Sequence, residues 1–216
     1  ISSGLVGSEM CIRDSVCADQ ISVLKAVKEG VGINLIDPML IGNKNLIIDK
    51  ANEVGLNIEN FEIINTKDDQ EAASVACSLA NDNKIKIIIK GNLHTDVLMK
   101  SYLKKEHNLI EGKRLSHIWH MTSPKLNKPL YLTDGALNVL PRVEIKLQIL
   151  KNAVEFFKKL HSSKPKVALL SGTEDPIESM PSSIDSKKVM ELALKEKEEP
   201  LVYAPLAFDN SESNFW

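Results

Sequence analysis

Four short polar segments, each directly after an apolar run, carry most of the side chains in this sequence that could do chemistry. They are residues 90–96 (K-G-N-L-H-T-D), 133–138 (T-D-G-A-L-N), 171–174 (S-G-T-E) and 204–210 (A-P-L-A-F-D-N). Hydroxyls, carboxylates or amides occur in each of them, and residues 112–117 (G-K-R-L-S-H) add a lysine and an arginine. Oriented donors and cations of this kind suit the binding of an anionic ligand and the stabilisation of an oxyanion.

The first of these segments shows how such side chains would be positioned. The preceding run, residues 85–89 (I-K-I-I-I), is short, β-branched and apolar on both faces, as in a parallel strand covered by helices on both sides. A helix is predicted to follow, with Thr95 or Asp96 as its cap. Residues 90–96 are therefore predicted to lie at the carboxyl end of a strand, before a helix N-terminus. Open α/β sheets bind ligands there, and a helix start favours anions.

The rest of the chain alternates between helical and extended patterns, which predicts a parallel sheet layered with helices. In such a sheet the polar segments would gather at one edge. Residues 116–121 and 130–132 flank a segment rich in turn residues, so a local antiparallel hairpin is expected there. The predicted helices span residues 21–27, 46–54 (closed by Gly55), 68–79, 97–105, 143–161 and 186–195, and the predicted strands span 38–42, 61–64, 85–89, 167–170 and 201–203.

Two of these helices carry more specific predictions. The helix at residues 143–161 has two adjacent apolar stripes, one containing Leu150 and Val154 and the other Phe156 and Leu160, which predicts deep burial of both. Asp185 directly precedes the helix at 186–195 and is predicted to cap it.

The composition excludes several classes of protein. The chain has 216 residues, 43% of them apolar, with 27 basic and 29 acidic side chains and a pI near 6.3, so neither nucleic acid nor an acidic membrane surface is expected as the main partner. Cys11, Cys17 and Cys77 form no C-x-x-C pair, which indicates neither a disulfide framework nor a zinc site and fits a reducing cytoplasm. Export is not expected, because the first residues lack a basic segment followed by a continuous apolar one, and no apolar stretch is long enough for a membrane span.

Both ends of the chain are unusual. Residues 1–15 lack an amphipathic period and look like translated sequencing-adaptor sequence, so they are expected to be non-native or disordered. The chain stops directly after a predicted strand and its polar segment, and is expected to be a fragment. The predicted domains are residues 16–140, a first α/β domain, and 141–216, part of a second.

Six collinear motifs between about residues 16 and 210 resemble the phosphate acetyl/butyryl transferase family, which exchanges an acyl group between coenzyme A and phosphate. The closer likeness is to the butyryl branch, including versions fused behind a hydratase domain, because the first and last motifs look like that branch. The motifs are K-G-N-L-H-T-D, G-K-R-L-S-H, T-D-G-A-L-N followed by Pro141, P-K-V-A-L-L-S with Glu174, M-P-S-S-I-D, and P-L-A-F-D-N.

The resemblance implies a fold similar to the isocitrate and isopropylmalate dehydrogenases, with a three-layer, parallel-rich sheet, a short antiparallel hairpin and two domains around a cleft. The second domain would be incomplete here. It also implies acyl-CoA and phosphate as partners, with coenzyme A as a substrate rather than a bound cofactor, and a homodimer or larger assembly. The family's serine-arginine pair and aspartate near its C-terminus match no residue up to Trp216, so the general base is expected beyond it. The chain has Ala204 where the family has glycine, and Lys100 where it often has arginine.

The resemblance and the residue chemistry together give the predicted site. Lys90 and Arg114 are expected to supply charge for phosphate or the oxyanion. Thr95, Ser116 and the helix start near Asp96 are expected to donate hydrogen bonds in a direct ternary-complex transfer. The predicted catalytic residues are Lys90, His94, Arg114 and Ser116, and the predicted substrate-binding residues are Thr95, Asp96, Lys100, His117, Thr133, Asp134, Asn138, Glu174, Asp209 and Asn210.

Each of these residues could also have a purely structural role. His94 could be an ordinary loop histidine, Lys90 could extend to the sheet edge, and Arg114 could pair with Glu106 or Glu111. His117 and His120 point to opposite faces of a strand, so no metal site is expected.

Two rival functions stay open at this level. One is a non-catalytic module that binds coenzyme A or a phosphate ligand. The other is a nicotinamide-dependent dehydrogenase, which is disfavoured because no G-x-G-x-x-G follows a strand. Acyl-chain preference, oligomeric state and the presence of an N-terminal hydratase domain are not encoded in any of these motifs.

Overall fold

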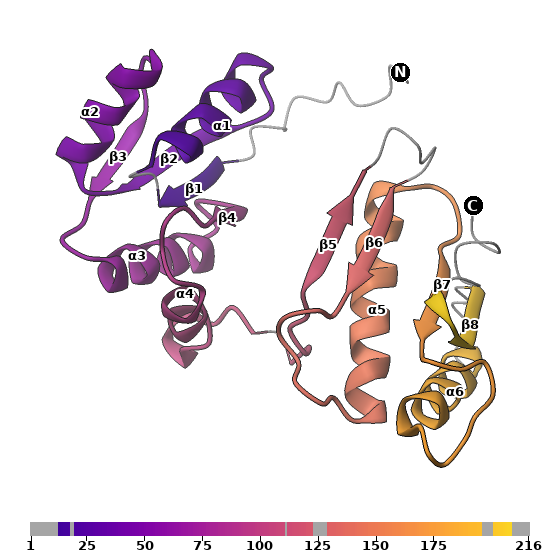
Figure 1. The fold of residues 1–216 in the computed structure, drawn as a ribbon. Coiled ribbons are helices and arrows are strands. Elements are labelled where there is room, and N and C mark those ends of the chain that lie inside the picture. The colour runs from indigo at the N-terminus through magenta and orange to yellow at the C-terminus, as the bar shows by residue number, and fades with distance from the viewer. Residues whose placement is uncertain (1–12, 18–19, 111, 123–128, 196–200, 209–216) are drawn as a thin grey trace. The chain divides into compact units, whose positions relative to one another are not determined.

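The structure, a computed structural model, describes residues 13–17, 20–110, 112–122, 129–195 and 201–208 (Figure 1). It divides into two compact units, Ile1–Glu111 and Gly112–Trp216. None of the helices in this described part of the chain is long and apolar enough to cross a membrane.

The first unit is built on a four-stranded parallel sheet. Its strands are β1 (Arg13–Cys17), β2 (Asp37–Gly42), β3 (Glu62–Asn65) and β4 (Ile87–Ile89), in the order β3-β2-β1-β4. The expected parallel pairing is confirmed for this unit. Strand β1 includes residues 13–15, which the sequence pattern excluded from the fold. Pairing depends on backbone N–H and C=O groups, so a strand between two others can form without an amphipathic side-chain period.

Four helices cover the two faces of this sheet: α1 (Ile21–Gly32), α2 (Lys44–Val54), α3 (Asp69–Asn81) and α4 (Thr95–Tyr102). Leu40 of β2 packs in one cluster with residues of α1 and α2, and its neighbour Ile41 packs in another with residues of α3 and with Leu93. Successive residues of a strand point to opposite faces, so α1 and α2 lie on one face and α3 and α4 on the other.

Local signals in the sequence set the ends of two of these helices. Asn43 caps α2, because its side-chain oxygen accepts hydrogen bonds from the N–H groups of Asn45 and Leu46. Gly55 ends the same helix in the left-handed conformation (φ 63°), as predicted. Asp68 caps α3 by accepting from the N–H of Glu71.

The edge strand β4 departs from its prediction. Ile88 packs against the cluster that contains Ile41, but Ile87 and Ile89 stay 46% and 37% exposed. The strand is thus covered on one face only, because it lies at the edge of the sheet. An apolar run alone does not distinguish an edge strand from a central one.

The second unit holds two separate two-stranded sheets. Strands β5 (Ile118–Met121) and β6 (Leu130–Thr133) are antiparallel, which confirms the predicted hairpin, although residues 123–128 of its loop lie outside the described residues. Strands β7 (Lys166–Leu170) and β8 (Leu201–Leu206) are parallel.

Helices α5 (Val143–Leu160) and α6 (Pro181–Leu194) supply the core of this unit. Leu150 and Val154 of α5 pack there against α6 and β8, as one of the predicted stripes requires. The second stripe, which also includes Ile149, is buried at that residue (6% exposed) but not at Phe156 and Leu160, which are 39% and 54% exposed.

Helix α6 also begins earlier than predicted, at Pro181, a residue whose fixed φ suits the first helical turn. Asp185 is therefore inside the helix rather than its cap. Its carboxylate instead accepts a hydrogen bond from Lys146 Nζ of α5 at 2.8 Å.

The boundary between the units lies near residue 111, whereas the sequence placed it at 140. The hairpin belongs with α5 because Tyr131 of β6 makes edge-on ring contacts with Phe156 and Phe157 at 5.8 Å. Figure 1 shows the hairpin lying along this helix.

The two clusters that meet at β2 predict a specific loss of stability. We expect Leu40→Ala to lower the free energy of unfolding by about 2–5 kcal/mol, because Leu40 is fully buried and its removal leaves a cavity. Leu46→Ala on α2, where the side chain is 44% exposed, serves as the control and should cost less than about 1 kcal/mol. Denaturant unfolding of the two variants measures the difference, and equal losses would contradict this account of the core.

Candidate active site

The predicted site residues are distributed over both units of the structure. Lys90, His94, Thr95, Asp96 and Lys100 belong to the first unit, and the remaining described ones belong to the second. Asp209 and Asn210 lie outside the described residues.

In the first unit, the loop between β4 and α4 is closed by its own lysine. Lys90 Nζ donates hydrogen bonds to the carbonyl oxygens of Leu93 at 2.8 Å and Gly91 at 3.4 Å. The side chain of Leu93 is buried in the core cluster between the sheet and helices α3 and α4, so it also anchors the loop. Lys90 thus sets the conformation of this loop and places its positive charge there.

The start of α4 differs from the predicted cap. The capping position is His94, whose side chain makes no capping hydrogen bond, and Thr95 is the first helical residue. Asp96 bonds Lys100 one turn along, at 3.1 Å, and this hydrogen bond holds the pKa of Asp96 below its usual value. Both side chains are exposed, so the pair contributes little to stability.

In the second unit, Asp134 organises the loop that follows β6. One carboxylate oxygen accepts hydrogen bonds from the N–H groups of Ala136 at 3.0 Å and Leu137 at 2.9 Å, and the other accepts from Asn138 Nδ2 at 2.5 Å. Burial alone would raise the pKa of Asp134, but these hydrogen bonds outweigh it and hold the pKa below its usual value. Asp134 is therefore a carboxylate at neutral pH. The peptide bond between Thr133 and Asp134 is cis.

Asn138 connects this carboxylate to Arg114. Its Nδ2 donates to Asp134 and to the carbonyl oxygen of Leu115 at 2.9 Å, so its Oδ1 is the atom that faces Arg114. Arg114 Nε donates to that oxygen at 2.7 Å. The guanidinium is thus fixed at its Nε, and among the described residues the predicted alternative partner Glu106 contacts Lys104 instead. Glu111 lies outside the described residues.

Sequence reasoning did not identify Asn152, which lies beside these residues. Its Nδ2 donates to the carbonyl oxygen of Arg114 at 2.6 Å and to Ser116 Oγ at 3.0 Å. Asn152 is on α5, 36 positions from Ser116, and the only signal for it in the sequence is an amide in an otherwise amphipathic helix.

The hairpin positions the next pair of predicted residues. Thr133 Oγ1 donates to the carbonyl oxygen of His117 at 2.7 Å, which connects β6 to the start of β5. The His117 ring contacts Trp119 edge-on at 4.8 Å, and its buried Nδ1 has no hydrogen-bond partner among the described residues. His120 stacks on Tyr131 instead, at 4.9 Å. The described part of the chain contains no group of three or more metal-binding side chains.

Glu174 is exposed in the loop after β7. This strand belongs to a different sheet from the β5–β6 hairpin, which Arg114 and Asp134 flank in sequence. Lys113, next to Arg114, forms an ion pair with Glu155 of α5 at 2.9 Å. The structure therefore brings Arg114, Ser116, Asp134 and Asn138 together with Asn152 into one hydrogen-bonded group, which we call the Arg114 cluster. This cluster can offer a guanidinium and a hydroxyl to an anionic ligand.

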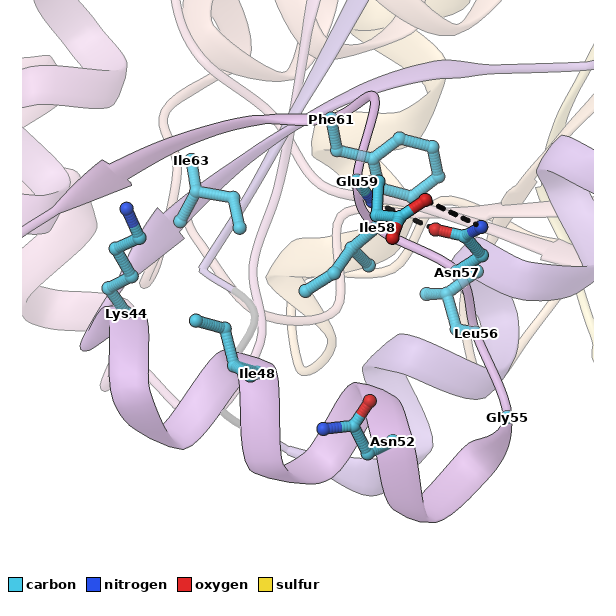
Figure 2. A pocket seen from close by; sticks show the side chains of 10 residues that line it. All are labelled: Lys44, Ile48, Asn52, Gly55, Leu56, Asn57, Ile58, Glu59, Phe61 and Ile63. Atoms are coloured by element: carbon cyan, nitrogen blue, oxygen red, sulfur yellow. Dashed lines mark hydrogen bonds between the residues drawn. The ribbon is translucent and has the colours of Figure 1, made fainter.

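A separate cavity of about 700 Å³ lies in the first unit (Figure 2). None of the predicted site residues lines it, so it is distinct from both polar groups described above. Its lining residues are Lys44, Ile48, Asn52, Gly55, Leu56, Asn57, Ile58, Glu59, Phe61 and Ile63.

Comparison with known proteins gives a consistent family. Residues 69–213 match the family model described as phosphate acetyl/butaryl transferase. The chain is 34% identical over 199 residues to a phosphate acetyltransferase of Rickettsia felis, covering 91% of this chain and 57% of that protein. It is 30% identical over 188 residues to a phosphate butyryltransferase of Clostridium acetobutylicum, covering 87% of this chain and 62% of that protein.

A solved structure shows the same fold. The crystal structure of a branched-chain phosphotransacylase from Enterococcus faecalis superimposes with a TM-score of 0.74 at 26% identity, covering 95% of this chain and 74% of that chain. The α/β fold is therefore similar to that of phosphotransacylases. The chain spans little more than half the length of the acetyltransferase that it matches, 57%.

The hydrogen bonds of Asp134 predict a pH-dependent contribution to stability. The pKa of Asp134 is lower in the folded chain than in the unfolded chain, where it is about 3.9. The hydrogen bonds therefore stabilise the fold fully at pH values above the unfolded pKa, and this stabilisation is lost as the pH falls through the folded pKa. We expect Asp134→Asn to lower the free energy of unfolding at neutral pH. The NH2 group of the new asparagine would be a donor facing other donors, such as Asn138 Nδ2, where the carboxylate accepted hydrogen bonds. The difference from wild type should shrink between about pH 5 and about pH 2. Denaturant unfolding across this range tests it, and a difference that does not vary with pH would count against the assignment.

Proposed function

The chain belongs to the phosphate acetyl/butaryl transferase family, and from this premise we propose that the complete protein exchanges a short-chain acyl group between coenzyme A and phosphate. The relatives that support the proposal are transferases of both the acetyl and the butyryl type. They favour catalysis over the rival reading of a module that only binds coenzyme A or phosphate.

The proposed reaction determines what the site must supply. A phosphate oxygen donates an electron pair to the thioester carbonyl carbon, and the carbonyl π pair moves to oxygen to give a tetrahedral oxyanion. When the oxyanion collapses, the carbon–sulfur bond breaks and its electron pair leaves with sulfur. The thiolate of coenzyme A then takes up a proton. Two anionic reactants and an oxyanion require fixed positive charge and oriented donors.

The observation that carries the proposal is the way Arg114 is held. Its Nε is engaged by Asn138, which is oriented by the ionised carboxylate of Asp134. A guanidinium fixed at Nε presents its two terminal nitrogens as a fork, and such a fork binds two phosphate oxygens at once. In this proposal Arg114 binds phosphate and the Ser116 hydroxyl donates to phosphate or the oxyanion.

The loop of the first unit enters the proposal through its charge and its helix start. Lys90 is a cation, and the exposed N-terminus of α4, with His94 and Thr95, is a source of hydrogen-bond donors, so this loop by itself can bind an anionic group of a substrate. Lys100 would bind an anionic group of coenzyme A in place of the family's arginine, in exchange for its contact with Asp96. His117, Glu174, Asp209 and Asn210 keep their predicted substrate-binding roles as part of the same proposal.

We propose direct transfer without an acyl-enzyme. Cys77 is fully buried, and burial raises the pKa of its thiol despite the nearby charge of Lys104, so it is unsuited to act as a nucleophile. The proposal also includes two properties that the family resemblance implies, an architecture like that of the isocitrate and isopropylmalate dehydrogenases and a homodimer or larger assembly. It further includes the cytoplasmic location that the cysteine usage favours. The parallel sheet of the first unit and the hairpin of the second support that architecture.

An assay of the complete protein tests the reaction. We expect phosphate-dependent release of free thiol from acetyl-, propionyl- or butyryl-coenzyme A, and no acyl adduct on Ser116 or Cys77 by intact mass after mixing with acyl-coenzyme A alone. Coenzyme A binding without thiol release would favour the binding module. A covalent acyl adduct that phosphate discharges would replace direct transfer with a two-step mechanism.

Substitution of Arg114 tests its role in phosphate binding. We expect Arg114→Lys to lower kcat/KM for phosphate by about tenfold and Arg114→Ala by about a hundredfold, because lysine keeps the charge but loses the fork. Arg142→Ala is the matched control. Arg142 is exposed just before α5 in the same unit, and its loss should change kcat/KM by less than about twofold. Equal effects of Arg114→Ala and Arg142→Ala would remove Arg114 from the site.

A further inference from the structure

Asn152 makes two hydrogen bonds to the segment that carries both proposed ligand-binding groups of the second unit. It lies on α5, half-buried, and reaches the backbone of Arg114 and the side chain of Ser116.

The orientation of the Asn152 amide follows from its partners. The carbonyl oxygen of Arg114, 2.6 Å away, can only accept a hydrogen bond, so the nearby side-chain atom must be the nitrogen. An NH2 group has two hydrogens, and the second points to Ser116 Oγ at 3.0 Å. Ser116 Oγ is therefore an acceptor in this contact.

This contact determines what the Ser116 hydroxyl can offer to a ligand. A serine oxygen has one hydrogen of its own, and an oxygen that accepts from Asn152 directs that hydrogen elsewhere. We propose that Asn152 is a positioning residue, which keeps the Ser116 hydroxyl as a donor toward the bound anion. The inference rests on the proposed function and adds to it a residue that no motif identifies.

The same amide also holds Arg114. Asn152 binds the main-chain oxygen of Arg114, and Asn138 binds its Nε, so the residue is fixed at both ends. The positions of a cation and a hydroxyl donor are thus coupled through one side chain of α5. A preorganised pair of this kind can stabilise developing negative charge with little rearrangement.

Kinetics of a double-mutant cycle test the role of Asn152. We expect Asn152→Ala to lower kcat by about tenfold with a smaller change in KM, and most of this loss to vanish in a Ser116→Ala background. Gln148→Ala, which removes an exposed amide one turn earlier on α5, is the control and should leave kcat unchanged. Asn152→Asp, which has nearly the same shape but cannot donate, should be at least as impaired as Asn152→Ala. A full tenfold loss that persists without Ser116 would show that Asn152 does not act through the Ser116 hydroxyl, and would overturn the inference.

A spectroscopic measurement on the full chain separates this inference from the proposed function. In a nitrogen-15 NMR spectrum, assigned through Asn152→Ala, we expect Ser116→Ala to shift one of the two side-chain amide protons of Asn152 and leave the other in place. If neither proton responds, Asn152 does not donate to Ser116 and the inference is wrong, whatever the protein catalyses. If one responds but wild type releases no thiol, the proposed function fails while the hydrogen bond stands.

Discussion

The negative charge of Asp134 is the constraint on which the second unit's polar group depends. A partly buried carboxylate has to replace lost water with other donors, and the donors of Asp134 include two backbone N–H groups and one amide from the next four residues. Once these bonds form, the amide of Asn138 has only one orientation. Its oxygen then faces Arg114, so a charge placed for local reasons determines where a guanidinium points.

Helix α5 connects this polar group to the hydrophobic core. Leu150 and Val154 bury one side of the helix against α6 and β8, while Asn152 and Glu155 bond the segment 113–116 on another side. Lys146 adds an ion pair to Asp185 of α6. Because the apolar side of α5 is fixed in the core, the position of the helix along its axis and its rotation about that axis are fixed as well, and so are the positions of Asn152 and Glu155. A rigid helix therefore supports a ligand site better than a loop would.

Much of the fold was predictable because it follows short-range rules. The order of helices and strands, the hairpin and the glycine end of α2 come from side-chain periods and turn residues that act within a few positions. One error arises where distant residues decide, since Ile87 and Ile89 are exposed because of sheet order. Others concern where a helix begins, since α6 starts at Pro181 and leaves Asp185 inside the helix, where it bonds Lys146.

In the predicted site, too, features that depend on nearby residues were predictable and those that depend on distant residues were not. The motif residues of the Arg114 cluster were named from the sequence, because they are close together along the chain. Their roles were not, since Asn138 orients Arg114 through an amide whose direction depends on three partners. Asn152 was missed because a contact across 36 positions leaves no periodic trace. The arrangement of side-chain hydrogen bonds is thus the part that required a structure.

Strand β2 has a consequence for how this first unit can change over evolutionary time. Residues 39–41 are all buried, and neighbouring positions belong to different clusters, so the strand has no side that faces water. A substitution there must satisfy one of two tightly packed environments, and slipping the strand by one residue would exchange Leu40 and Ile41 between them. Tolerated variation should therefore accumulate at the strand ends and on outer helix surfaces. The loop that carries Lys90 and His94 follows the end of β4, and apart from the buried Leu93 its exposed positions could acquire new binding properties without disturbing either core.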